Sequence, residues 1–218
     1  MMIGPANYID MYLSGKSYEE AKKELKNLWK EINRLKKVIE EHPDSEEMVI
    51  CPMPAVKIST YRDYLESARE YFESQGWEYE YTKEEIADKE FNDRLKDVQS
   101  IKIEYGGYFG GCESRKIIFE DNEIITERDI FNAVPDPKEL NRQFYKGMTR
   151  DILLSELAEF HIGEWKKEYE DPCVLDGTQW SVTFKYTDGK KRKFEGSNRY
   201  PYNFGGFLDV MEIEARDK

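Results

Sequence analysis

The chain has 218 residues, which is enough for one large domain or two small ones. Its formal net charge of −12 argues against binding to nucleic acid or to an anionic membrane, because both require a cationic surface, but it is compatible with a basic protein partner. Aromatic residues make up 14% of the sequence and can build a core, which excludes a disordered polymer.

The clearest predicted helix covers residues 17–41. Ser17 and Glu20 have the spacing of a capping box, and Pro43 marks the end of the helix. Apolar side chains recur in alternating steps of three and four, at Tyr18, Ala21, Leu25, Leu28, Ile32, Leu35 and Ile39. This heptad stripe predicts an N-terminal helical arm over residues 1–45. The arm either docks on its own domain or forms a homodimer seam through residues 17–41.

Residues 46–99 are predicted to form a small α/β segment. Pro52 and Pro54 indicate an extended connector, residues 55–59 a short strand, and the spacing after Thr60 a helix. Aromatic residues alternate with glutamates over 77–81, which is typical of a half-buried strand. A second capping box starts a helix at residue 82. Residues 51–100 have a net charge of −5, so a basic partner would bind their exposed helix faces.

The remainder is predicted to be a C-terminal antiparallel sheet. Strands alternate around Ile101, resume after the glycine-rich stretch 105–112, and form a hairpin at 176–197 whose turn is Asp188-Gly189. A long helix at about 149–169 covers this sheet. The chain is therefore expected to be an α+β protein with an arm at 1–45 and a domain at 46–218, which has a possible internal boundary near 99.

Three widely spaced cysteines, Cys51, Cys112 and Cys173, indicate a reducing compartment and no disulfide framework. No apolar run is long enough to span a membrane, and the N-terminus does not resemble a signal peptide. These observations predict a cytoplasmic protein that does not bind membranes.

Two loops combine aromatic residues with glycines and are candidate binding sites. In the first, Tyr108 and Phe109 lie between pairs of glycines. In the second, the binding candidates are Asn198, Arg199, Tyr200 and Tyr202. Turn chemistry is the simpler interpretation of both loops, because asparagine and glycine favour turn conformations and proline ends a central strand.

Other chemistry-bearing residues have simpler interpretations. The basic run 190–193 protects a strand edge, so nucleic acid is an unlikely partner. A pair of His161 with Cys112 or Cys173, oriented by Asp176, has no support in the spacing. Neither metal-ligand spacing nor a cofactor motif occurs, so no catalytic residue, metal or cofactor is predicted.

The stretch 176–204 resembles a C-terminal pattern in uncharacterised proteins of Gram-positive gut bacteria and their mobile elements. The shared residues are Asp-Gly-Thr-x-Trp at 176–180 and Gly-Ser-Asn-x-Tyr-Pro at 196–201, with the 105–111 loop as a companion element. The resemblance covers residues 55–211. It implies a bacterial or phage cytosolic origin and brings no known activity.

The sequence therefore favours a non-catalytic protein-binding module. Together with the acidity, the resemblance suggests an inhibitor or immunity-type protein in phage–host conflict. One alternative is an acidic nucleic-acid mimic that blocks a basic enzyme, for which salt sensitivity of the complex is the test. Another is an enzyme with a carboxylate acid/base site, for which a pocket carboxylate with a raised pKa is the test.

Overall fold

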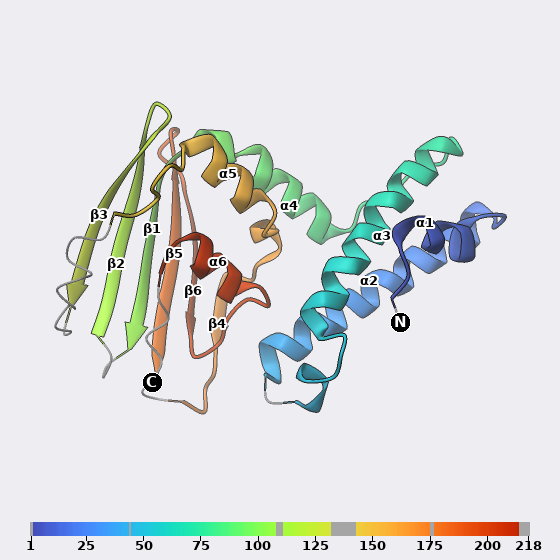
Figure 1. The fold of residues 1–218 in the computed structure, drawn as a ribbon, viewed down its shortest axis with the longest axis horizontal. Helices are drawn as coiled ribbons and strands as arrows, with labels where there is room; N and C mark the ends of the chain where they lie inside the picture. Colours follow the sequence, from blue (N-terminus) through green and yellow to red (C-terminus); the bar gives the residue numbers. More distant parts are fainter. Residues whose placement is uncertain (1, 44, 108–110, 132–142, 175–176, 214–218) are drawn as a thin grey trace. The chain divides into compact units, whose positions relative to one another are not determined.

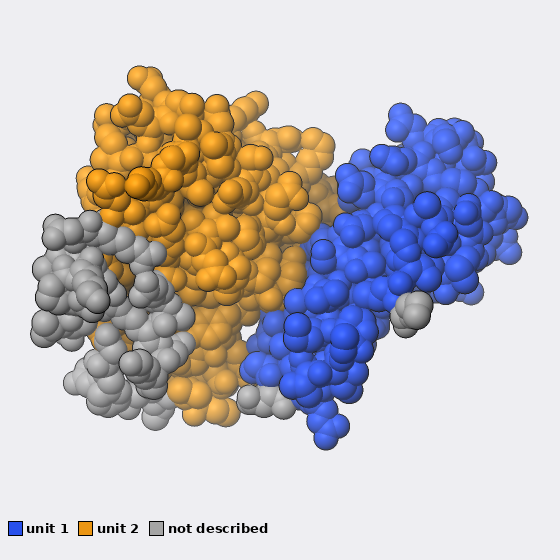
Figure 2. All heavy atoms as spheres, viewed as in Figure 1, with its two compact units in different colours: residues 1–81 blue, residues 82–218 orange. Residues whose placement is uncertain are grey.

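A computed structural model describes residues 2–43, 45–107, 111–131, 143–174 and 177–213. The chain divides into two compact units, residues 1–81 (unit 1) and 82–218 (unit 2), which Figure 2 distinguishes by colour. The boundary predicted at 45/46 falls inside unit 1. In the parts of the chain that the structure describes, every helix is too short or too polar to cross a membrane.

The regular elements that the structure describes in unit 1 are all helices (Figure 1). It contains α1 (Pro5–Tyr8), a π-helical turn (Ile9–Leu13), α2 (Tyr18–Glu41), a short 3-10 turn (Glu46–Met48) and α3 (Pro54–Ser74). Residues Ser17 and Glu20 form the predicted capping box at the start of α2. The heptad stripe of α2 is buried from Ala21 to Leu35 and half-buried at its two ends, Tyr18 and Ile39, and α2 packs against α3 within this unit. The stripe thus forms part of an intramolecular core, and a homodimer seam through 17–41 remains a prediction.

The α+β class is confirmed, but the two strands predicted inside the small α/β segment do not form, and the only strand residues among its described residues, 98 and 99, begin the first strand of unit 2. The strand at 55–59 was wrong, because Pro54 occupies the first helical turn, where its fixed φ and missing N–H are tolerated, and starts α3. The strand at 77–81 was also wrong. That stretch joins no sheet and instead packs its rings within unit 1, where Tyr79 and Tyr81 meet edge to face and lie 5.4 and 5.7 Å from the Arg69 guanidinium.

Unit 2 contains a six-stranded sheet in the order β3-β2-β1-β5-β6-β4 (Figure 1). Neighbouring strands are antiparallel except β4 and β6, which are parallel. The strands are β1 (Val98–Gly107), β2 (Gly111–Glu120), β3 (Glu123–Phe131), β4 (Glu168–Glu170), β5 (Thr178–Tyr186) and β6 (Lys191–Ser197). The predicted β5–β6 hairpin is confirmed, but four residues, 187–190, lie between its strands instead of the predicted two, with Gly189 at φ 81°.

One face of the sheet is covered by α4 (Lys83–Asp93), α5 (Arg150–Ala158) and α6 (Phe204–Val210), as Figure 1 shows. Phe91 of α4 meets Phe184 edge to face, with ring centroids 5.0 Å apart. Trp180 of β5 lies 4.4 Å from Phe204 of α6. The core of unit 2 is therefore an aromatic layer between the central strands and these helices.

The helix predicted at 149–169 is much shorter than expected. It ends at Ala158, His161 adopts the left-handed conformation at φ 48°, and a short 3-10 turn (Ile162–Glu164) leads into β4. The side chain of Asn203 donates to the carbonyl of Phe160, and this contact replaces a continuing helical hydrogen bond. Apolar spacing alone therefore extended the predicted helix beyond its true end.

Gly196 provides a test of this packing. A Cβ at this position would lie 2.4 Å from Trp180 Nε1 and 2.7 Å from the carbonyl oxygen of Arg199. We expect Gly196→Ala to lower the free energy of unfolding by about 2 kcal/mol, because the buried indole must move. The matched control is Gly205→Ala, where a Cβ meets nothing within 4 Å and the residue lies in a helix. Equal stability of the two variants in urea would contradict this packing.

Candidate functional site

The second face of the sheet is polar and mostly exposed. Because strand side chains alternate, the residues between the aromatic positions of β5 point to this second face, as do their register partners on β1 and β6. This surface, here called the open face, carries Lys102, Glu104, Gln179, Ser181, Lys193, Glu195 and Ser197. Short side chains at its centre leave room above the strands.

A hollow of about 620 Å³ lies on the open face. Carboxylates of β1, β4 and β6 line it together with a thiol, hydroxyls, an amide and one lysine. The charged lining residues are Glu104, Glu168, Glu170, Glu195 and Lys193. Four carboxylates against one ammonium group give the lining a formal excess of three negative charges. The hollow therefore favours a cationic ligand.

Two of these carboxylates are already neutralised. Glu104 lies 2.6 Å from Lys102 Nζ, and Lys193 Nζ lies 2.5 Å from Glu195. The side chains of Glu168 and Glu170 form no ion pair or hydrogen bond with any residue that the structure describes. Both are exposed, and both point from the edge strand β4 to the same face. They are the free negative charges at this site.

The pKa of Glu104 does not shift as that of a general acid or base would. The hydrogen bond from Lys102 lowers the pKa of Glu104, although burial opposes this shift. Burial, followed by the charge of Glu104, raises the pKa of the Cys112 thiol, which keeps the thiol protonated. A pocket carboxylate with a raised pKa was the test for the enzyme alternative, and Glu104 shifts in the opposite direction.

The structure also shows where the predicted binding residues lie. Tyr108 and Phe109 lie outside the described residues. Asn198 adopts φ 56°, a turn conformation that asparagine tolerates, and its amide donates to the carbonyl of Val174. The guanidinium of Arg199 lies 3.1 Å from Asp171, and its carbonyl accepts a 2.8 Å hydrogen bond from Trp180. Both residues thus have structural roles in the turn.

The two tyrosines of this loop are half-buried. Tyr200 stacks on Phe204, with ring centroids 5.4 Å apart and an interplanar angle of 25°, and packs against the core. Tyr202 also takes part in an interaction with another residue. Much of the ring surface that was predicted to contact a partner is therefore used within the fold, while the hollow lies on the neighbouring strands.

Strand alternation divides the basic run 190–193 between the two faces. Lys191 and Lys193 point to the open face, whereas Arg192 lies under the helices, 5.0 Å from the ring centroid of Phe91, and donates to the carbonyl of Gly163. The run therefore does not present a continuous cationic surface, as a phosphate backbone would require.

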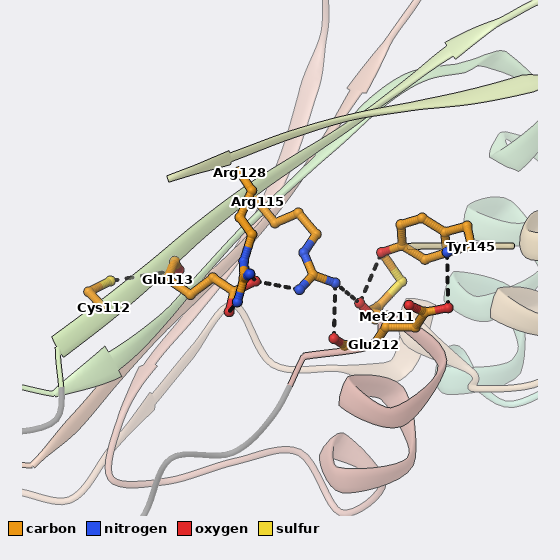
Figure 3. A network of polar contacts seen from close by, with 7 residues as sticks. All are labelled: Cys112, Glu113, Arg115, Arg128, Tyr145, Met211 and Glu212. Carbon is orange, nitrogen blue, oxygen red and sulfur yellow. Dashed lines mark hydrogen bonds and ion pairs between the residues drawn. The ribbon is translucent and has the colours of Figure 1, made fainter. Parts of the chain in front are cut away.

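A buried ionic network lies in the first half of β2 (Figure 3). Arg115 is 1% exposed and donates to the carbonyls of Met211 and Glu212, at 2.7 and 3.0 Å, and to the carboxylate of Glu113. Arg128 makes two further hydrogen bonds to that carboxylate. Burial alone would raise the pKa of Glu113, but the hydrogen bonds from Arg128 and the charge of Arg115 hold it below its ordinary value.

This network has a structural role, because it attaches the segment after α6 to the sheet. Tyr145 donates to the carbonyl of Met211 at 2.9 Å, and the ring of Phe144 lies 3.8 Å below the Arg115 guanidinium. Burial raises the pKa of Tyr145 to about 12, so its hydroxyl stays a donor at neutral pH. The sequence pattern did not reveal this network, since its members come from four separate segments.

A third cluster lies on the helix-covered side of unit 2. Asp88 of α4, His161 and Glu164 each offer a ligand atom within 4.8 Å of the other two. His161 Nδ1 lies 2.7 Å from Asp88 Oδ2. Because Cys112 points to the open face and His161 contacts α4 on the helix-covered side, the Cys112–His161 pair considered from the sequence does not form. Cys173 is an exposed, free thiol, and Asp176 lies outside the described residues.

Comparisons with protein-family models, with curated proteins and with solved structures found no match for this chain. The resemblance of 176–204 to proteins of gut bacteria therefore remains an expectation.

The buried network gives a prediction that depends on pH. Glu113→Gln should lower the free energy of unfolding at pH 7 by about 3 kcal/mol, because it leaves Arg115 without its buried counter-ion. Glu113 has a lower pKa in the folded protein than in the unfolded chain, where it is near 4.5. Its ionised form therefore stabilises the fold fully above pH 4.5, and this stabilisation is lost as the pH falls through the pKa of the folded protein. The deficit of the variant in denaturant titrations should therefore shrink below pH 4.5.

The matched control is Glu127→Gln, which removes an exposed carboxylate that lies 3.0 Å from Lys116. We expect it to change stability by less than about 0.5 kcal/mol at either pH. A deficit of Glu113→Gln that stays constant from pH 7 to pH 3 would show that the lost stability is not electrostatic.

Proposed function

We propose that this protein is a non-catalytic protein-binding module that accepts a basic, extended segment of a partner in the hollow of the open face. The observation that carries the proposal is the unneutralised pair Glu168 and Glu170 on the edge of a hollow that is itself acidic. This placement moves the expected contact surface from the aromatic loops to the strands.

The spacing of the two carboxylates suggests which segment fits. Glu168 and Glu170 lie two residues apart on β4, so their side chains repeat at about 6.6 Å along the strand. An extended partner has the same two-residue repeat, and arginine forms two parallel hydrogen bonds to a carboxylate. A segment with arginine at alternate positions therefore matches β4 in both charge and spacing.

The other lining groups suit a peptide backbone. Gln179, Ser181 and Ser197 line the hollow beside the carboxylates and offer both donors and acceptors. A cytoplasmic location is proposed on the basis of the three free thiols. An inhibitor or immunity-type role in phage–host conflict extends the proposal and depends only on the resemblance noted in the sequence.

The test uses an eight-residue fluorescein-labelled peptide in which arginine and serine alternate, titrated with the full chain and followed by fluorescence anisotropy. We expect binding that weakens as salt is added. In the double variant Glu168→Gln, Glu170→Gln, the Kd should rise at least about tenfold, because two free charges are removed at the contact.

The matched control is Glu156→Gln, Glu159→Gln, which removes the same net charge from exposed positions at the end of α5. Its affinity should equal that of the unchanged chain. A peptide with its four arginines in one block should bind more weakly than the alternating one. Equal losses in the two double variants would mean that the peptide responds only to net charge, and the proposed site would be wrong.

A further inference from the structure

We propose that Asp88, His161 and Glu164 form a binding site for a divalent transition-metal ion, for which Zn²⁺ is the probe. The site lies between α4 and the turn that follows α5, on the side of unit 2 opposite the hollow. It is independent of the proposed peptide-binding function.

The three side chains have suitable chemistry and are close together. One imidazole and two carboxylates each contribute a donor atom, and these atoms lie within 4.8 Å of one another. Imidazole nitrogen and carboxylate oxygen are ordinary Zn²⁺ ligands at about 2.0–2.2 Å. Three protein ligands would leave the fourth tetrahedral position open to water. The two carboxylates would balance the charge of the ion.

Backbone packing holds the cluster in place. Gly163 approaches α4 so closely that a Cβ there would lie 2.3 Å from Asp88 Cα. Its N–H donates to Asp88 Oδ1 at 3.2 Å, which orients the carboxylate and leaves Oδ2 facing His161. His161 itself adopts the left-handed conformation, which costs a non-glycine residue energy. This turn places His161 and Glu164 on either side of the Gly163 contact.

The hydrogen bond between Asp88 and His161 marks the place of the ion. Nδ1 and Oδ2 are 2.7 Å apart and share one proton. A Zn²⁺ ion would replace that proton, and tetrahedral geometry would separate the two atoms to about 3.3 Å. The side chain of Asp88 is 10% exposed and that of His161 is 30% exposed, so the site is anchored on the buried side and accessible from solvent.

A nearby cation would limit the affinity. Arg192 donates to the carbonyl of Gly163 at 3.0 Å and interacts electrostatically with Asp88. Part of the negative charge of the cluster is therefore offset before any ion binds. We expect moderate affinity for Zn²⁺ and Co²⁺, and weak affinity for Mg²⁺, which prefers oxygen ligands alone.

The experiment titrates the full chain with Zn²⁺ up to about 1 mM by isothermal calorimetry, a range that detects even weak sites. Co²⁺ replaces Zn²⁺ in a parallel titration, in which visible absorption reports the imidazole and carboxylate ligands. A bound Co²⁺ should also quench Trp165, the buried neighbour of Glu164. We expect about one ion per chain.

Two variants and a matched control locate the ion. His161→Asn and Glu164→Gln should each raise the Kd for Zn²⁺ at least about tenfold. Asparagine tolerates the left-handed conformation, so the first variant keeps the turn. His42→Asn, which removes the exposed histidine at the end of α2, should bind as the unchanged chain does. Circular dichroism establishes that each variant is folded.

Two results would overturn the proposal. Absence of binding over the whole concentration range would show that the three side chains only form a hydrogen-bonded cluster. Binding that survives in folded His161→Asn and Glu164→Gln would place the ion elsewhere, for example at the free thiols.

Discussion

Unit 2 depends on burial of the aromatic layer between the central strands and the helices. Trp180, Phe184 and Phe194 point to one face of β5 and β6, where Trp165 meets Phe194 at 5.5 Å and Phe207 at 5.2 Å. Each large ring removes much apolar area from water, so this face cannot be exposed without a large loss of stability. Because successive side chains of a strand point to opposite faces, burial of these rings places the intervening residues on the solvent-exposed face. The acidic hollow and the aromatic core are thus two sides of the same pair of strands.

The same layer positions the cluster around His161. Phe91 holds α4 against β5 and β6, which places Asp88, one turn earlier on the helix, over the chain that leaves α5. Trp165 anchors the other end of that turn in the core. The metal-binding proposal therefore depends on two aromatic anchors that fix the backbone on both sides of the polar groups. The packing of the aromatic residues determines the geometry of the cluster, and its polar side chains determine which ligands it can bind.

Local patterns were sufficient where a segment carries its own signal. The capping box at Ser17 located α2, and alternation around Trp180 located the β5–β6 hairpin. Local patterns failed where tertiary contacts determine the secondary structure of a segment. Pro54 suggested a connector although it starts α3, and apolar spacing carried α5 past Ala158 although Asn203 takes the Phe160 carbonyl. The candidate sites were harder to predict from the sequence. Asp88 and His161 are 73 residues apart, and Glu168 lies beside Glu195 only because β4 pairs with β6. The spacing of residues within one segment does not predict contacts between distant segments.

The guanidinium of Arg115 also sets an order of events during synthesis. Its carbonyl acceptors, at Met211 and Glu212, lie 96 and 97 residues further along the chain. At ordinary translation rates these acceptors are made roughly 5–20 s after β2. During that interval the Arg115 guanidinium on β2 stays hydrated, because its carbonyl acceptors do not yet exist. The packing around this part of β2 is therefore incomplete. Unit 2 therefore reaches its final packing only after its last helix has been made, whatever the β1–β2 hairpin does earlier.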